Sequence, residues 1–84
     1  MIPEIKPGDL IEIIKIDIAC FPLPMENRLL YVLNFIPFCA GFFPTCRIEY
    51  YDSNFMLQGI NILHYKCAQQ FELGNWKLHK QMSI

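Results

Sequence analysis

Isoleucine-rich alternation near the start of the chain predicts an N-terminal β-strand. A turn is expected at Pro7-Gly8-Asp9, because proline and glycine supply the backbone angles of tight turns. Residues 10–18 are mostly apolar and rich in isoleucine, which suits a pleated strand. Ile11 and Ile13 share one face, but Ile14 breaks the alternation. We therefore expect a bulge, or two short strands with a bend, at this point.

The longest apolar stretch, residues 29–46, has no charged residue and lies between Arg28 and Arg47. Its eighteen residues approach the roughly 20 that a membrane-spanning helix needs. Prolines suit a lone spanning helix poorly, because no neighbouring helix can satisfy the freed carbonyl groups. A buried or membrane-surface segment is the first interpretation, and a true span is the second. In both, Pro37 and Pro44 should break the segment into pieces.

The clearest helical pattern lies near residues 60–73. Apolar residues recur there at helical spacing, at Ile60, Leu63, Cys67 and Phe71. Asn61 is a candidate N-cap, and Gly74 lies where a left-handed residue would end the helix. The pattern therefore predicts one C-terminal helix.

These elements predict one small α+β domain over residues 1–84, with a short N-terminal strand or strands and a proline-broken hydrophobic middle segment. Residues 50–54, Tyr-Tyr-Asp-Ser-Asn, are typical of a strand end followed by a turn. A chain of 84 residues is too short for two domains. A hydrophobic content of 54% argues against intrinsic disorder.

Charge and cysteine content narrow the classes of function. Seven Lys and Arg against eight Asp and Glu leave no basic surplus, so no nucleic-acid partner is predicted. The first residues lack the apolar core of a secretory signal, so we expect a cytoplasmic protein, with or without membrane association. The cysteines are then expected to be reduced thiols, at Cys20, Cys39, Cys46 and Cys67. Six residues separate Cys39 from Cys46, which does not fit a structural zinc site, and no metal or cofactor is predicted.

The run Lys6-Pro7-Gly8-Asp9-Leu10-Ile11-Glu12-Ile13 resembles the opening strand of the lecithin retinol acyltransferase-like family, in its phospholipase A and acyltransferase branch. With the Ile2-Pro3-Glu4 leader, the resemblance covers about the first 13 residues. It implies a small α+β domain related to circularly permuted papain-like hydrolases. It also implies thiol-based acyl transfer from a glycerophospholipid to water or an amine.

The catalytic residues of that family do not carry over to this chain. Acyl transfer by a thiol needs a thiolate, an imidazole and donors for the oxyanion. The family's His-Trp pair falls at Cys20 and Phe21, so the imidazole is absent there. Its Asn-Cys-Glu-His-Phe motif is matched here only by Cys67 and Phe71. Cys67 and His64 are weak catalytic candidates three residues apart, and core packing is the more common role for such a pair.

Two hypotheses of function follow from these patterns. The leading one is a truncated or divergent relative of a phospholipase A/acyltransferase acting on glycerophospholipids, with little or no catalysis. The alternative is a small membrane-associated, non-enzymatic protein in which residues 29–46 insert into a bilayer or lie in its interface. Arg28 and Arg47 would then lie at the phospholipid headgroups. Aspartate at Phe35 and Phe42 should abolish such membrane association.

Three further residues carry weaker signals. Trp76, with lysines nearby, is a candidate interfacial anchor. His79 is expected to be exposed, and Glu12 is expected to be a solvated charge with no acid–base role. A compact globular binding module remains the third class of function.

Overall fold

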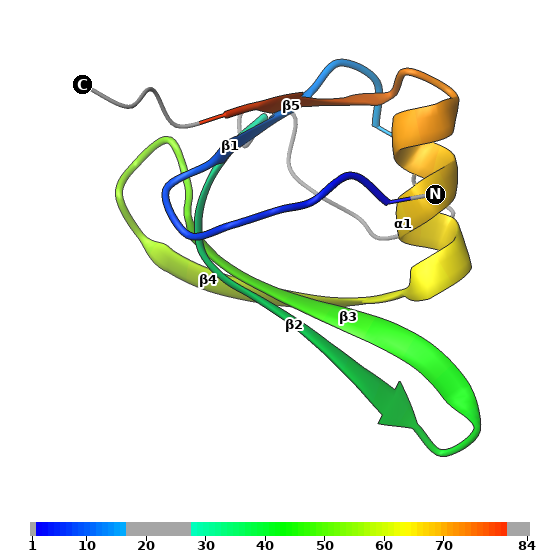
Figure 1. Ribbon diagram of the computed structural model, residues 1–84. Helices are drawn as coiled ribbons and strands as arrows, with labels where there is room; N and C mark the ends of the chain where they lie inside the picture. Colours follow the sequence, from blue (N-terminus) through cyan, green and yellow to red (C-terminus); the bar gives the residue numbers. More distant parts are fainter. Residues whose placement is uncertain (1, 17–27, 81–84) are drawn as a thin grey trace.

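Residues 2–16 and 28–80, the part of the chain that this computed structural model describes, contain five antiparallel strands and one short helix (Figure 1). The α+β class predicted from the sequence is confirmed. In chain order the elements are β1 (Leu10–Ile13), β2 (Leu29–Ala40), β3 (Phe43–Tyr51), β4 (Leu57–Leu63), α1 (His64–Glu72) and β5 (Trp76–His79).

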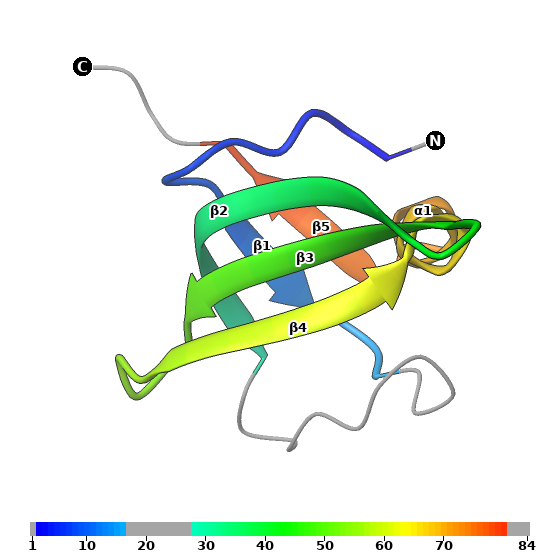
Figure 2. The same ribbon diagram turned by 90° about the horizontal axis from the view of Figure 1, so that it is seen from below.

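The strands form one antiparallel sheet in the order β4-β3-β2-β1-β5. The sheet curls over, so that β1 and β5 lie across from β3 and β4 (Figure 2). Buried side chains from both halves fill the space between them, among them Ile11, Ile13, Leu30, Ile48 and Ile62. Helix α1 contacts β3, β4 and β5 and contributes Cys67 to the same core.

The N-terminal turn is confirmed, and the strand breaks at Ile14 as expected, but residues 14–16 form a bend and the stretch after it and not a second strand. Gly8 has a φ of 94°, and the Asp9 amide donates to the Lys6 carbonyl over 3.1 Å. Ile11 and Ile13 are buried on one face of β1, whereas Ile14 is 49% exposed in a bend after the strand. The change of face at Ile14 therefore ends the strand. The end of the predicted strand, residues 17–18, lies outside the described residues.

The prediction that prolines break residues 29–46 into pieces is wrong. Strand β2 continues through Pro37 and β3 continues through Pro44, and the chain reverses between them at Gly41. A proline cannot donate to a ladder, so it is tolerated where a strand has a neighbour on one side only. In the described chain, β1 pairs only with residues 29–31 of β2, and β4 pairs with β3 only from Thr45 onward. Both prolines therefore lie on open strand edges.

The C-terminal helix is confirmed, but it is shorter than predicted. It begins at His64, and residues 60–63 belong to β4. Asn61 is therefore a strand residue paired with Arg47, not an N-cap. The alternating residues Ile60 and Ile62 pair with buried positions of β3, and this pairing outweighs the helical spacing. The predicted end is confirmed: Gly74 has a φ of 75°, and its amide donates to the Phe71 carbonyl.

The expectations for Trp76 and His79, which both lie in β5, are wrong. Trp76 is 3% exposed and packs edge-on against Phe71, with ring centroids 5.6 Å apart, so it is a core residue and not an interfacial anchor. His79 is half-buried, and its Nε2 lies 2.9 Å from Glu12 Oε1 on the neighbouring strand. Glu12 is therefore paired across the sheet.

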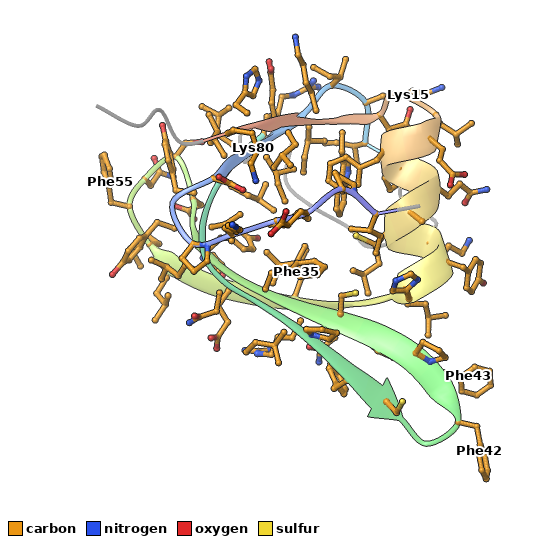
Figure 3. The ribbon with its side chains drawn as sticks, in the orientation of Figure 1. Lys15, Phe35, Phe42, Phe43, Phe55 and Lys80 are labelled. Atoms are coloured by element: carbon orange, nitrogen blue, oxygen red, sulfur yellow. The ribbon has the colours of Figure 1, made fainter. Side chains whose placement is uncertain are left out.

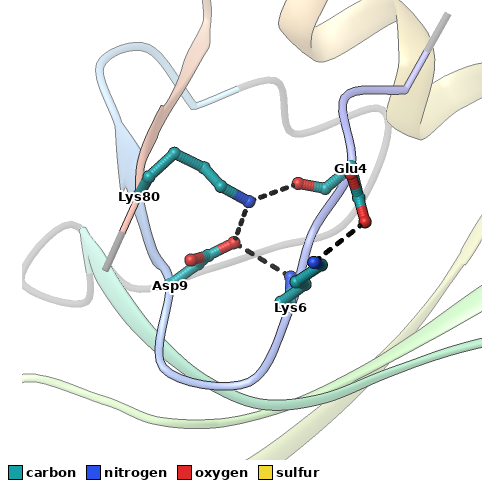
Figure 4. Close-up of polar contacts among 4 residues, drawn as sticks. All are labelled: Glu4, Lys6, Asp9 and Lys80. Carbon is teal, nitrogen blue, oxygen red and sulfur yellow. Dashed lines mark hydrogen bonds and ion pairs between the residues drawn. The ribbon is translucent and has the colours of Figure 1, made fainter. Parts of the chain in front are cut away.

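A buried carboxylate joins the two ends of the described chain (Figure 4). Asp9 is 2% exposed, and its Oδ2 accepts from Lys80 Nζ over 2.7 Å and from the Lys6 amide over 2.9 Å. Lys80 Nζ also donates to the Glu4 carbonyl over 2.8 Å. This contact, here called the terminal clasp (Glu4, Lys6, Asp9 and Lys80), holds the N-terminal segment against the end of β5.

Candidate functional site: the tip of the β2–β3 hairpin

The far end of the β2–β3 hairpin is an exposed apolar surface without charge. Every residue from 36 to 44 is exposed, and we call this segment the hairpin tip. Phe42 is 98% exposed and Phe43 is 64% exposed. The hairpin projects beyond the core (Figure 1), and at its end both side chains point away from the rest of the molecule (Figure 3).

The turn at the end of the hairpin explains why an aromatic ring is presented there. Ala40 pairs with Phe43, so Gly41 and Phe42 form a two-residue turn. Gly41 has a φ of 64°, while the φ of Phe42 is not positive, as a type II′ hairpin turn requires. Phe42 occupies the second turn position, where no strand neighbour covers its ring. The turn therefore places a large apolar side chain at the most distant point of the hairpin.

The hairpin tip is apolar on both of its faces. Ile36 and Phe38 lie on the outer face and are 43% and 39% exposed. Pro37 and Cys39 lie on the opposite face and are also exposed, because the hairpin extends past the core. Phe35 is the last half-buried residue before the tip, and it packs against the core (Figure 3). The tip therefore begins where the core ends.

A row of hydrogen-bonded polar side chains crosses the outer face just before the tip. Asn34 Nδ2 donates to Glu49 Oε1 over 3.1 Å, and Arg47 Nη1 donates to Asn61 Oδ1 over 3.2 Å. Arg47 Nε also lies 3.5 Å from Glu49 Oε2. The guanidinium group lies over Gly59, where a Cβ atom would collide with it. These four side chains, here called the polar band (Asn34, Arg47, Glu49 and Asn61), mark an abrupt change from polar to apolar surface along the hairpin.

A second exposed apolar cluster lies at the other end of β3, around the β3–β4 turn. Its large side chains are Tyr31, Tyr51, Phe55, Met56 and Leu57. The rings of Tyr31 and Phe55 are stacked, with centroids 6.5 Å apart. Phe55 has a φ of 59°, which is unfavourable for a residue with a Cβ atom. Unlike the tip, this cluster surrounds a charged group, the carboxylate of Asp52.

The Asp52 carboxylate organises the β3–β4 turn. Its Oδ1 accepts from the amides of Asn54 and Met56 over 2.8 and 3.0 Å, and its Oδ2 accepts from Gln58 Nε2 over 3.3 Å. The bond from Met56 does most to lower the pKa of Asp52, burial opposes it, and the other two bonds lower it further. The pKa of Tyr50 is raised by its burial and by repulsion from this carboxylate.

Replacing Asp52 with asparagine should weaken the dependence of stability on acidic pH. Because folding lowers the pKa of Asp52, its ionised form stabilises the fold above about pH 4, its unfolded pKa, and this contribution is lost as the pH falls through the folded pKa. An asparagine side chain would keep one acceptor oxygen and would not titrate. Urea unfolding between about pH 2 and 7 measures the effect. An unchanged pH dependence in the variant would contradict it.

The structure places the sequence-predicted catalytic candidates in different environments. Cys67 is fully buried in the core side of α1, whereas His64 is exposed at the first residue of the helix. Burial raises the pKa of the Cys46 thiol, which favours its unreactive protonated form. Cys39 is an exposed free thiol in the hairpin tip. Cys20 and Phe21, where the family's His-Trp pair would fall, lie outside the described residues.

The described residues contain neither a candidate metal centre nor a helix that could span a membrane. Within residues 2–16 and 28–80, His, Cys, Asp and Glu side chains do not gather in threes that could hold a metal ion. In the same part of the chain, no helix has the length and apolarity needed to cross a membrane. The interpretation of residues 29–46 as a spanning helix is wrong, because these residues form the hairpin.

Comparison of the chain with protein-family models, with curated proteins and with solved structures finds no match. The function must therefore be inferred from the geometry of the molecule itself. The resemblance of the first 13 residues to acyltransferases stays a prediction.

Proposed function

We propose that this protein is a small membrane-associated domain that binds lipid surfaces by inserting its hairpin tip. The observation that carries the proposal is the exposure of every residue from 36 to 44, on both faces of the hairpin, without a charge. A flat protein partner would cover one face of a hairpin. A fluid apolar phase covers all sides, and the hydrocarbon boundary of a bilayer is such a phase.

The dimensions and energies of the tip suit an interfacial insertion. Apolar segments that bind bilayers enter the headgroup and acyl boundary by about 5–10 Å. A strand rises about 3.3 Å per residue, so the turn and two or three residues of each strand reach that depth. Burying a fully exposed Phe side chain contributes about 1.5–3 kcal/mol. Phe42 is 98% exposed, so almost its whole side chain is available for transfer.

Replacing Phe42 with aspartate should reduce binding to phosphatidylcholine vesicles by about 30-fold or more. The variant loses the transfer free energy of one Phe side chain and adds a carboxylate that resists dehydration. Co-sedimentation of the purified protein with vesicles measures the partition coefficient. Phe42 has no covering neighbours in the hairpin turn, so the fold should keep its thermal stability.

Phe55→Asp is the matched control. Phe55 is also highly exposed, but it lies at the opposite end of β3, and aspartate tolerates its left-handed backbone better than most residues. Its vesicle binding should stay within about twofold of the unsubstituted protein. Equal losses in both variants would show non-specific adhesion and would overturn the proposal, as would a protein that does not bind vesicles at all.

The structure makes one of the two substitutions that the sequence suggests, at Phe35, unsuitable as a test of membrane association. Phe35 is half-buried and packs against the core, so Phe35→Asp would damage the fold as well as any membrane contact. Phe43, which is 64% exposed in the tip, is the better second position. Phe43→Asp should weaken vesicle binding without unfolding the domain.

A further inference from the structure

We infer that the hairpin tip binds lipid surfaces without needing anionic headgroups, so that an electrically neutral surface of the phosphatidylcholine type is sufficient, and that the polar band sets the depth of insertion. This inference rests on the proposed function and adds the class of lipid to it. Three observations support it: the uncharged tip, the internal pairing of the nearest charges, and the position of the polar band.

The charges near the tip nearly cancel one another. Arg47 is engaged by Glu49 and by Asn61 within the polar band. Lys66 lies in α1, three residues after Leu63, which pairs with Thr45 at the base of the tip. The Nζ of Lys66 lies 5.8 Å from the centroid of the Tyr65 ring. The other described lysines and Arg28 lie on or beside β1, β5 or the start of β2. The tip therefore lacks a basic cluster, in a chain with a net charge of -1.

This balance predicts little preference for anionic lipids. Each cation held near an anionic membrane surface strengthens binding by about fivefold. A polybasic surface gains this fivefold factor once for each of its cations, whereas the tip gains it only once, from Lys66. Apolar transfer, which salt screens very little, then supplies nearly all of the binding. Similar binding to neutral and anionic vesicles follows from this arrangement.

The polar band fixes how far the hairpin enters. Ile36 is the cross-strand partner of Arg47, so the apolar surface meets the band within one step of the strand. Moving the band below the headgroups would strip water from the Arg47 guanidinium and the Glu49 carboxylate, which is costly. The band therefore stops at the headgroups, where phosphate and choline groups can contact it.

The experiment compares three proteins on two vesicle compositions. The unsubstituted protein, Phe42→Asp and Glu49→Gln are each mixed with phosphatidylcholine vesicles and with vesicles containing about 30% phosphatidylserine. Each series is measured at about 50 and 500 mM NaCl. Glu49→Gln keeps one acceptor oxygen, which can serve either Asn34 or Arg47, and removes the negative charge of the band. A Phe42→Trp variant, whose indole would be quenched by lipids brominated at known depths, reports the position of the turn.

The unsubstituted protein should bind both compositions within about fivefold, with little change in salt. Glu49→Gln should gain up to about fivefold on phosphatidylserine vesicles at low salt and lose that gain at high salt. Binding that needs phosphatidylserine or disappears in high salt would overturn this inference and leave the proposed function standing. An unchanged lipid preference in Glu49→Gln would overturn the placement of the band at the headgroups. Failure to bind either composition would overturn both proposals.

Discussion

Replacing Trp76 with alanine is expected to lower the free energy of unfolding by about 3–5 kcal/mol. Trp76 is 3% exposed, lies in β5 and packs edge-on against Phe71 of α1. Its removal leaves a large cavity where the last strand, the helix and β1 meet. Domains of 84 residues have about 4–13 kcal/mol of stability in total, so this loss is a large fraction of it. Urea unfolding, monitored by circular dichroism, measures the change in the free energy of unfolding.

This prediction has two controls: the stability of the Trp76→Phe variant, and the vesicle binding of the Trp76→Ala variant. Phenylalanine refills part of the cavity and retains an aromatic contact with Phe71, so about half of the loss or less is expected. At a temperature where Trp76→Ala stays folded, its affinity for vesicles should equal that of the unsubstituted protein. A variant with normal stability and weakened vesicle binding would instead identify Trp76 as a membrane anchor.

The features that could be predicted from the sequence are those decided by neighbouring residues. The Pro7-Gly8-Asp9 turn, the end of β1 and the helix end at Gly74 each depend on a few adjacent positions. Proline, glycine and a change of apolar face are enough to specify them. The beginning of α1 depends instead on whether Ile60 and Ile62 find a partner strand. That partner is β3, and the local helical spacing contains no information about it.

The sequence predicts where the candidate site lies in the chain, but it does not predict the hairpin that forms the site. The uncharged run at residues 29–46 predicts a buried or membrane-surface segment, of which the structure exposes residues 36–44, and its two prolines suggest a broken segment. Prolines are compatible with strands whose outer edge is open, and only the sheet order shows that those edges are open. Gly41 was the missed signal, because a Gly-X pair between two apolar runs is typical of a hairpin turn. The polar band joins three strands and has no local signature at all.

Five residues of the opening run 6–13 have structural roles in this fold. Pro7 and Gly8 lie in the turn, and Ile11 and Ile13 are buried in the core. Asp9 accepts hydrogen bonds within the terminal clasp. Turn formation, core packing and the clasp thus explain why a proline, a glycine, an aspartate and alternating isoleucines occur together.

Replacing Asp9 with alanine is expected to destabilise the fold by about 2–4 kcal/mol. The substitution removes the acceptor of the Lys80 ammonium and of the Lys6 amide, which lie 2.7 and 2.9 Å from Asp9 Oδ2. Lys80 is about half exposed and can turn to water, so the cost falls below that of breaking a fully buried ion pair. The free energy of unfolding in urea measures the loss, and amide hydrogen exchange should show it first in the N-terminal segment and β5.

Two further variants separate the charge from the hydrogen bonds of the terminal clasp. Asp9→Asn keeps an acceptor oxygen for the Lys6 amide and should lose about half as much stability as Asp9→Ala. Lys80→Met keeps the apolar stem of the side chain, but it leaves a carboxylate that is only 3% exposed without its ammonium partner. Lys80→Met should therefore destabilise the fold, although the Lys80 side chain is itself about half exposed. If Asp9→Ala and Lys80→Met both unfold like the unsubstituted protein, the clasp does not hold the chain ends together, and β5 is retained by Trp76 and its strand pairing alone.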